Sequence, residues 1–270
     1  MFHHRIDDPS ASRVFVKWYI LAFAAGSINA GAFMAAGRFV THMTGFGTLF
    51  GVEVAHARWE GAIGILFVPA FFLLGTMISA YMVDHRFHRG RRPHYDWVMF
   101  LEVLCLVAAA VGGQLHFFGS FGEPLKLKSD FALLALLCLA SGLQNAAITS
   151  ATGSSVRTTH LTGITTDLGI GIVRALALKG HRKHHDREVR ANWLRAGTIF
   201  SFYAGSVVGA ILFLKVQYYG FYLPAAIAFY GLHQAKLEND RQRKREARKA
   251  HLRGAPVPAP GPERIQSPNA

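Results

Sequence analysis

Six long apolar runs, almost free of charged residues, constrain the fold of this chain more than any other feature. A transmembrane helix needs about 20 apolar residues to cross about 30 Å of hydrocarbon, and every run except the last, shorter one approaches that length. Buried helices of a soluble protein would show polar faces, which these runs lack. The sequence therefore predicts a polytopic α-helical membrane protein. The runs are 14–36, 61–83, 97–118, 131–151, 196–214 and 216–232.

The composition favours the same class. Of the 270 residues 51% are hydrophobic, yet 29 Lys and Arg against 16 Asp and Glu leave a formal net charge of +13. A soluble domain rarely combines these properties. The first run is long for a signal-peptide core and no Ala-x-Ala cleavage site follows it, so we expect it to remain as a span. Cys105 and Cys138 lie inside apolar runs and are expected to be buried thiols without a disulfide.

The connections between the apolar runs are alternately rich and poor in lysine and arginine. These residues are frequent before the first run, between runs two and three, between runs four and five, and after the last run. Because basic residues favour the cytoplasmic side, both termini are predicted to lie in the cytoplasm. The predicted units are a cytoplasmic tail 1–13, a three-span repeat 14–118, an external loop 119–130, a second three-span repeat 131–235, a basic juxtamembrane helix 236–253 and a disordered tail 254–270.

One pentapeptide occurs twice, as THMTG at 41–45 and THLTG at 159–163. Segments around both copies also match in order: GSINAG with GLQNAA, TGFGTLFG with TGITTDLG, and FLLGTMISA with FYAGSVVGA. The chain therefore contains two copies of one unit. An odd number of spans inverts the second copy, which predicts an all-α membrane fold of six transmembrane helices in a 3+3 inverted-topology repeat. Two parallel four-span units are the alternative, which would export the arginines between runs two and three.

Glycine, threonine and histidine concentrate in and after each pentapeptide. Glycine weakens a helix, and non-helical backbone at membrane depth must be buried in protein or line a water-filled cavity. We therefore expect broken or re-entrant elements at 37–57 and 153–176, with short helices starting near Thr44 and Thr162. The free N–H groups at such helix starts suit an anion or polar solute. A capping and packing role without a ligand is the open alternative.

The stretches GSINAGAFMAAGRFVTHMTGFGTLFG and SGLQNAAI…TTHLTGITTDLG resemble the two signature stretches of the YoaK-type family, small bacterial integral membrane proteins grouped under a domain of unknown function. The resemblance covers most of residues 14–232. It implies a bacterial inner-membrane protein and brings no established substrate or reaction. Family members often have an acidic residue where this chain has Asn29, and Asn where it has Phe46. A proton-coupling role for the first span is therefore not carried over.

We predict a solute pathway where the two units meet, since repeat interfaces are where transporters bind. The alternative is a non-transporting membrane scaffold or accessory protein. No nucleophile, acid–base pair or metal-ligand set stands out, so we expect no enzyme activity, no cofactor and no metal. The candidate pathway residues are Asn29, Thr41, His42, Thr44, Gly45, Thr48, Asn145, Thr159, His160, Thr162, Gly163, Thr166 and Asp167.

Other ionisable residues have simpler interpretations. His42 and His160 occupy equivalent positions, where a proton-linked role and a purely structural role are both open. The histidines at 181, 184 and 185 are predicted to lie in a solvated basic loop rather than a metal site. Glu102 lies inside the third run, where a charge is costly in lipid, and pairing with Arg92 or another loop arginine would account for it.

Two further patterns concern partners. GSVVG and its counterpart GTMIS place small residues four apart, which predicts close helix crossings at Gly75, Ser79, Gly205 and Gly209, between the units or between protomers. The basic stretch 236–253 is predicted to lie against anionic lipids of the inner leaflet. Nucleic acid is a less favoured partner because aromatic residues do not alternate with the basic ones.

Overall fold

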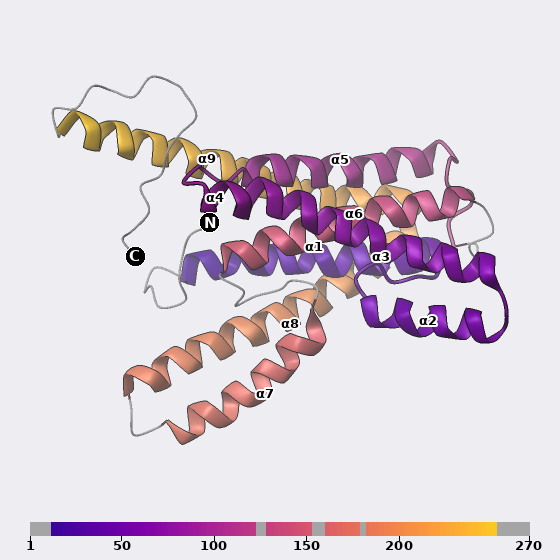
Figure 1. The fold of residues 1–270 in the computed structure, drawn as a ribbon, viewed down its shortest axis with the longest axis horizontal. Helices are drawn as coiled ribbons and strands as arrows, with labels where there is room; N and C mark the ends of the chain where they lie inside the picture. The colour runs from indigo at the N-terminus through magenta and orange to yellow at the C-terminus, as the bar shows by residue number, and fades with distance from the viewer. Residues whose placement is uncertain (1–11, 123–127, 153–159, 179–181, 253–270) are drawn as a thin grey trace.

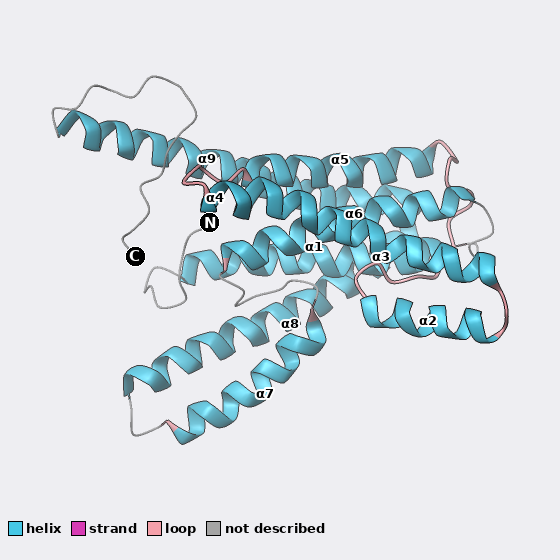
Figure 2. Ribbon diagram, in the orientation of Figure 1, coloured by secondary structure: helices cyan, strands magenta, loops and turns pink. Residues whose placement is uncertain are grey.

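The computed structural model describes residues 12–122, 128–152, 160–178 and 182–252, and within these ranges the regular structure is helical (Figure 1). Figure 2 shows the helices joined by short turns, with no strand in the described parts of the chain. The α-helices are α1 Ser12–Ala36, α2 Met43–Ala55, α3 Trp59–Ala80, α4 Arg86–His88, α5 Tyr95–Gln114, α6 Lys128–Ala151, α7 Leu161–Ala177, α8 Arg182–Val216 and α9 Tyr222–Leu252. A π-helical segment, η2 Tyr81–His85, follows α3, and a 3₁₀ turn, η3 Gln217–Phe221, separates α8 from α9.

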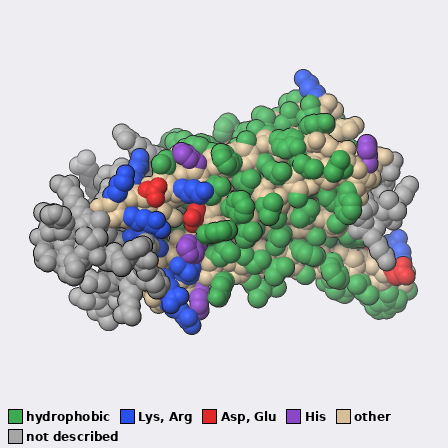
Figure 3. Space-filling model, turned by 90° about the horizontal axis from the view of Figure 1, so that it is seen from above, with side chains coloured by type: hydrophobic (Ala, Val, Ile, Leu, Met, Phe, Trp, Pro, Cys, Tyr) green, Lys and Arg blue, Asp and Glu red, His purple; other side chains and the backbone are tan. Residues whose placement is uncertain are grey.

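Five helical stretches in the described residues are long and apolar enough to cross a membrane: Phe15–Ala36, Trp59–His88, Tyr95–Gln114, Phe131–Ala151 and His184–Arg241. The last contains most of α8 and the first part of α9, so the fifth and sixth predicted runs are joined in one stretch. Figure 3 shows a broad band of hydrophobic side chains, with lysine and arginine gathered mainly toward one end. These features are those of a multi-pass membrane protein.

The first of two closely packed helix pairs joins α1 to α8. A Cβ added to Gly205 of α8 would overlap the backbone carbonyl of Phe23 on α1. In return, a Cβ added to Gly26 of α1 would overlap the carbonyl of Phe202 on α8. The two backbones therefore touch at a pair of glycines, one on each helix, and the contact depends on the missing side chains.

The second pair joins α3 to α6 and repeats this contact. A Cβ on Gly75 of α3 would overlap the carbonyl of Leu139, and a Cβ on Gly142 of α6 would overlap that of Phe72. The aligned sequence segments place Gly75 opposite Gly205 and Gly142 opposite Gly26. The same reciprocal glycine contact therefore occurs twice between the units, once between α1 and α8 and once between α3 and α6.

Helices α5 and α9 complete the bundle. α5 packs on α6 and α9, while α9 also contacts α1. Large apolar side chains from several helices fill the interior, and both cysteines are buried there as free thiols. The largest fully buried side chains include Trp18, Ile28, Met99, Leu134, Phe213 and Phe221. α9 continues without a break to Leu252, so the last apolar run from Tyr222 onward and the described part of the basic stretch form one helix.

The prediction of a solvated loop around His184 and His185 is wrong, because α8 begins at Arg182 and includes both residues. The ring of His185 lies 2.8 Å from the Ala175 carbonyl and so connects α8 to α7. No glycine or proline interrupts residues 182–196, and Arg195 lies 3.6 Å from Glu188 on the same helix. A charged segment without helix breakers, supported by α7, therefore continues the apolar helix outward. His181 lies outside the described residues.

Candidate functional site

Each pentapeptide leads into a helix. α2 begins at Met43 and α7 at Leu161, one residue before the predicted starts at Thr44 and Thr162. His42 and His160 are the N-cap residues, and their backbones are alike, with φ and ψ of −97° and 69° in one and −98° and 58° in the other. Neither imidazole makes a capping hydrogen bond. From the histidine onward, the two copies therefore have the same local structure.

The glycine that ends each pentapeptide makes room for the histidine ring. A Cβ at Gly45 would lie 2.7 Å from Nδ1 of His42, and a Cβ at Gly163 would lie 2.9 Å from Nδ1 of His160. Both rings thus lie over the first turn of their helices. This contact explains why histidine and glycine recur together three residues apart.

Thr48 and Thr166 form hydrogen bonds within their helices and do not cap them. The hydroxyl of Thr48 donates to the carbonyl of Thr44 at 3.2 Å, and that of Thr166 donates to Thr162 at 2.9 Å. All four residues are exposed, as is Asp167. The Thr-Gly pair is therefore not the helix cap that the ligand-free alternative proposed.

Asn29 of α1 holds the segment that precedes α2. Its Oδ1 accepts the backbone N–H of Val40 at 3.2 Å, the N–H of Thr41 at 3.4 Å and the Thr41 hydroxyl at 3.1 Å. The equivalent Asn145 on α6 has a buried Oδ1 without a hydrogen-bond partner in the described part of the chain. Thr159, the counterpart of Thr41, lies outside the described residues.

A cavity of about 470 Å³ connects the two units at the α3–α6 pair. It runs along α3 and η2 from Phe72 to Asp84, a rise of about 18 Å at 1.5 Å per residue. Thr41, Asn145 and His160 line it, and these are the predicted pathway residues that the structure brings together. The other described candidates do not line it: Asn29, His42, Thr44, Gly45, Thr48, Thr162, Gly163, Thr166 and Asp167.

Sequence reasoning missed other polar residues of this cavity. The hydroxyl of Thr76 donates to the Leu73 carbonyl at 2.6 Å, and Ser150 donates to the Asp84 carboxylate at 2.7 Å across the α6–η2 contact. Thr149 also lines the cavity and donates to the backbone of Asn145 one turn earlier. The spacing could have predicted Thr149, because it follows Asn145 by four residues and therefore lies on the same face of the helix.

Glu102 is fully buried in α5, and neither of its carboxyl oxygens has a hydrogen-bond partner among the described residues. The expected pairing of Glu102 with Arg92 or a neighbouring arginine is therefore wrong. Arg92 is itself mostly buried, and its carbonyl accepts a hydrogen bond from Arg86 at 3.0 Å. A carboxyl without a partner inside a membrane bundle is costly and is often a functional group.

Comparisons with known proteins address the identity of the chain directly. Residues 18–232 match the model of a family described as "Protein of unknown function (DUF1275)". No curated protein and no solved structure matches the chain. The match agrees with the resemblance noted in the sequence at the level of a domain of unknown function, while the YoaK-type name remains a prediction. Since the matched region runs from α1 into α9 and covers well over half of the sequence, the chain belongs to the DUF1275 family.

Proposed function

We propose that this protein transports a small polar solute across the bacterial inner membrane, along the interface between its two units. The observation that carries the proposal is the cavity beside the α3–α6 pair, which is lined by Thr41 from the first unit and by Asn145 and His160 from the second. Transporters built from inverted repeats bind their substrates at this kind of interface.

The glycine contacts support the inverted repeat. Exchanging the two units converts the α1–α8 contact into the α6–α3 contact, which is the relation expected of two copies arranged about a twofold axis. In this proposal α8 and α9 cross the membrane separately, giving six spans. One straight helix of the 58 residues in His184–Arg241 would be about 87 Å long, far beyond the thickness of a bilayer. The turn at η3 supplies the reversal.

The cavity lining indicates the chemistry of the solute. Hydroxyl, carboxamide, imidazole and carboxylate groups face the space together with apolar side chains such as Met43 and Phe72. Asn145 lines the cavity, and its carboxamide is a group that can hydrogen-bond a polar solute. A compact molecule with hydrogen-bond donors and a modest apolar part fits this lining.

The test is solute uptake by proteoliposomes containing the full chain. The panel comprises radiolabelled amino acids, sugars, organic cations and organic anions, and the expected result is saturable uptake of one class. Asn145→Leu and Thr76→Val should then lower uptake per folded molecule, because both residues line the cavity. Thr48→Val is the matched control, since its hydroxyl bonds within α2 outside the cavity. No uptake across the whole panel would favour the scaffold or accessory alternative.

A further inference from the structure

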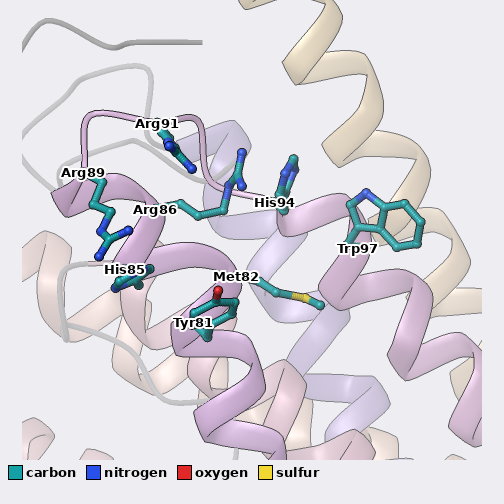
Figure 4. Close-up of a pocket in the computed structure, with 8 residues that line it drawn as sticks. All are labelled: Tyr81, Met82, His85, Arg86, Arg89, Arg91, His94 and Trp97. Carbon is teal, nitrogen blue, oxygen red and sulfur yellow. The ribbon is translucent and has the colours of Figure 1, made fainter. Parts of the chain in front are cut away.

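A second pocket, of about 300 Å³, lies where α3 passes through η2 into α4 and where α5 begins. Three arginines line it, Arg86, Arg89 and Arg91, together with His85 and His94 (Figure 4). No aspartate or glutamate is among the described residues that line it. The pocket therefore concentrates cationic and hydrogen-bond-donating groups in a small volume, apart from the cavity between the units.

The backbone holds these side chains in place. The π-helical segment η2 carries His85, and π-helical turns within α-helices often occur at functional sites. Gly90 takes a positive φ of 63°, which lets the chain reverse between α4 and α5. The N–H of His94 then donates to the Met82 carbonyl at 3.0 Å, and Nε of Arg86 donates to the Arg92 carbonyl at 3.0 Å. The turn is thus closed by specific bonds.

Among the described residues, no carboxylate forms an ion pair with Arg86, Arg89 or Arg91. The side chains of Arg89 and Arg91 are exposed and take part in no hydrogen bond or ion pair within the described residues. The Asp84 carboxylate faces Ser150 in the other cavity, and Asp96 lies 3.8 Å from His94. Several guanidinium groups around one pocket repel each other, so an anion entering the pocket would be stabilised by all of them.

The pocket lies at the boundary between the apolar band and the polar end of the molecule. It is located at the ends of two candidate spans, Trp59–His88 and Tyr95–Gln114. Tyr81 and Trp97, exposed by 67% and 53%, form its rim, and such residues favour the membrane–water interface. One turn further into the band, Met77 and Phe100 are also exposed. Apolar surface for acyl chains therefore adjoins the cationic pocket directly.

We propose that this pocket binds the phosphate group of an anionic glycerophospholipid. The arginines and histidines contact the phosphate, Tyr81 and Trp97 lie at the level of the glycerol backbone, and the acyl chains follow the exposed faces of α3 and α5. α3 and α5 each pack on α6 and scarcely touch one another, so both faces are available to the lipid. Basic pockets between membrane helices recognise anionic headgroups in this way.

Native mass spectrometry of the full chain in a neutral detergent tests this site, with phosphatidylglycerol as the probe. Arg89→Gln combined with Arg91→Gln should weaken binding about 25-fold, taking about fivefold for each arginine near an anionic lipid. Arg174→Gln combined with Arg190→Gln removes the same charge from exposed positions on α7 and α8, outside the basic stretch 236–253, and should bind like the parent. If the double pocket variant does not fold, Arg91→Gln alone should show about a fivefold loss.

Two further probes identify the source of the phosphate. Phosphatidylcholine has the same phosphodiester but no net charge, and should bind more weakly than phosphatidylglycerol. Glycerol 3-phosphate has the phosphate without acyl chains, and should not compete at lipid concentrations. Equal binding of phosphatidylglycerol by the parent and the Arg89 and Arg91 variant would overturn the site. Competition by glycerol 3-phosphate at the concentration of the lipid would assign the pocket to a soluble phosphate ester and overturn the lipid.

Discussion

The carboxamide oxygen of Asn29 accepts the hydroxyl of Thr41 at 3.1 Å, and this bond links the first long helix to the first copy of the repeated pentapeptide. The same oxygen accepts two backbone N–H groups at 3.2 and 3.4 Å. One side chain thus fixes the path of the segment that enters α2. In the first copy, this direct contact explains why the segment GSINAG accompanies the pentapeptide THMTG.

Replacing Asn29 should therefore test a structural role. Asn29→Leu removes the acceptor of three bonds and should lower the free energy of unfolding by about 1–3 kcal/mol. Asn29→Asp retains an acceptor oxygen and should unfold close to the parent. Thermal unfolding in detergent, followed by circular dichroism, measures both. If Asn29→Leu melts like the parent, the three bonds contribute nothing to stability.

The glycine crossings should be sensitive to a single methyl group. Gly26→Ala and Gly142→Ala each place a Cβ on a backbone carbonyl of the partner helix, so we expect a loss of about 1–3 kcal/mol or a lower folded yield. Gly47→Ala and Gly51→Ala are matched controls, because nothing lies within 4 Å of a Cβ at either position of α2. They should be neutral or stabilising by up to about 1 kcal/mol. Equal effects in both sets would contradict the packing interpretation.

Much of this architecture was predictable because its signals are local. The apolar runs predicted the long helices, and the paired small residues predicted close crossings at Gly75 and Gly205. The sequence could not predict the helix each glycine would contact, since GxxxG indicates a close approach without naming the partner. The contact of Gly205 with Phe23, between units within one chain, had to come from the structure.

Other features could not be predicted because they depend on tertiary contacts. The Tyr81–His85 segment contains no glycine or proline to indicate a π-helical turn, and its cationic pocket forms only when α5 returns beside it. Thr76 carries no special sequence signal, and it lines the cavity because α3 presents that face to α6. The charged start of α8 resembles a loop in composition, yet α7 supports it as helix.

Reporter fusions test the proposed orientation. Fusions at Arg89 and His184 should report cytoplasm, because the basic residues near both positions favour that side of the membrane. A fusion at Glu53, near the end of α2, should report the outside. An external Arg89 would exclude the inverted repeat and favour the two parallel four-span units.

Glu102 provides a test of proton coupling in the proposed transporter. Glu102→Gln removes a buried ionisable group whose oxygens have no partner in the described residues, so we expect no loss of thermal stability. If the carboxyl carries a proton through the bundle, uptake by the variant should no longer respond to an imposed pH gradient. Glu60→Gln, at an exposed position in the first turn of α3, is the charge-matched control. An unchanged response in Glu102→Gln would exclude this residue as the coupling group.

The two pentapeptide histidines allow the same substitution to be compared at equivalent positions. Both rings lie over the first turn of their helix without a capping bond, so His42→Ala and His160→Ala should change thermal stability little and by similar amounts. Only His160 lines the cavity between the units, whereas His42 lies edge-on to Phe39, with ring centroids 6.1 Å apart. Uptake per folded molecule should therefore fall more in His160→Ala than in His42→Ala. Equal losses of stability with unchanged uptake would show instead that the pentapeptide shapes a helix start, and that it occurs twice because the unit was duplicated.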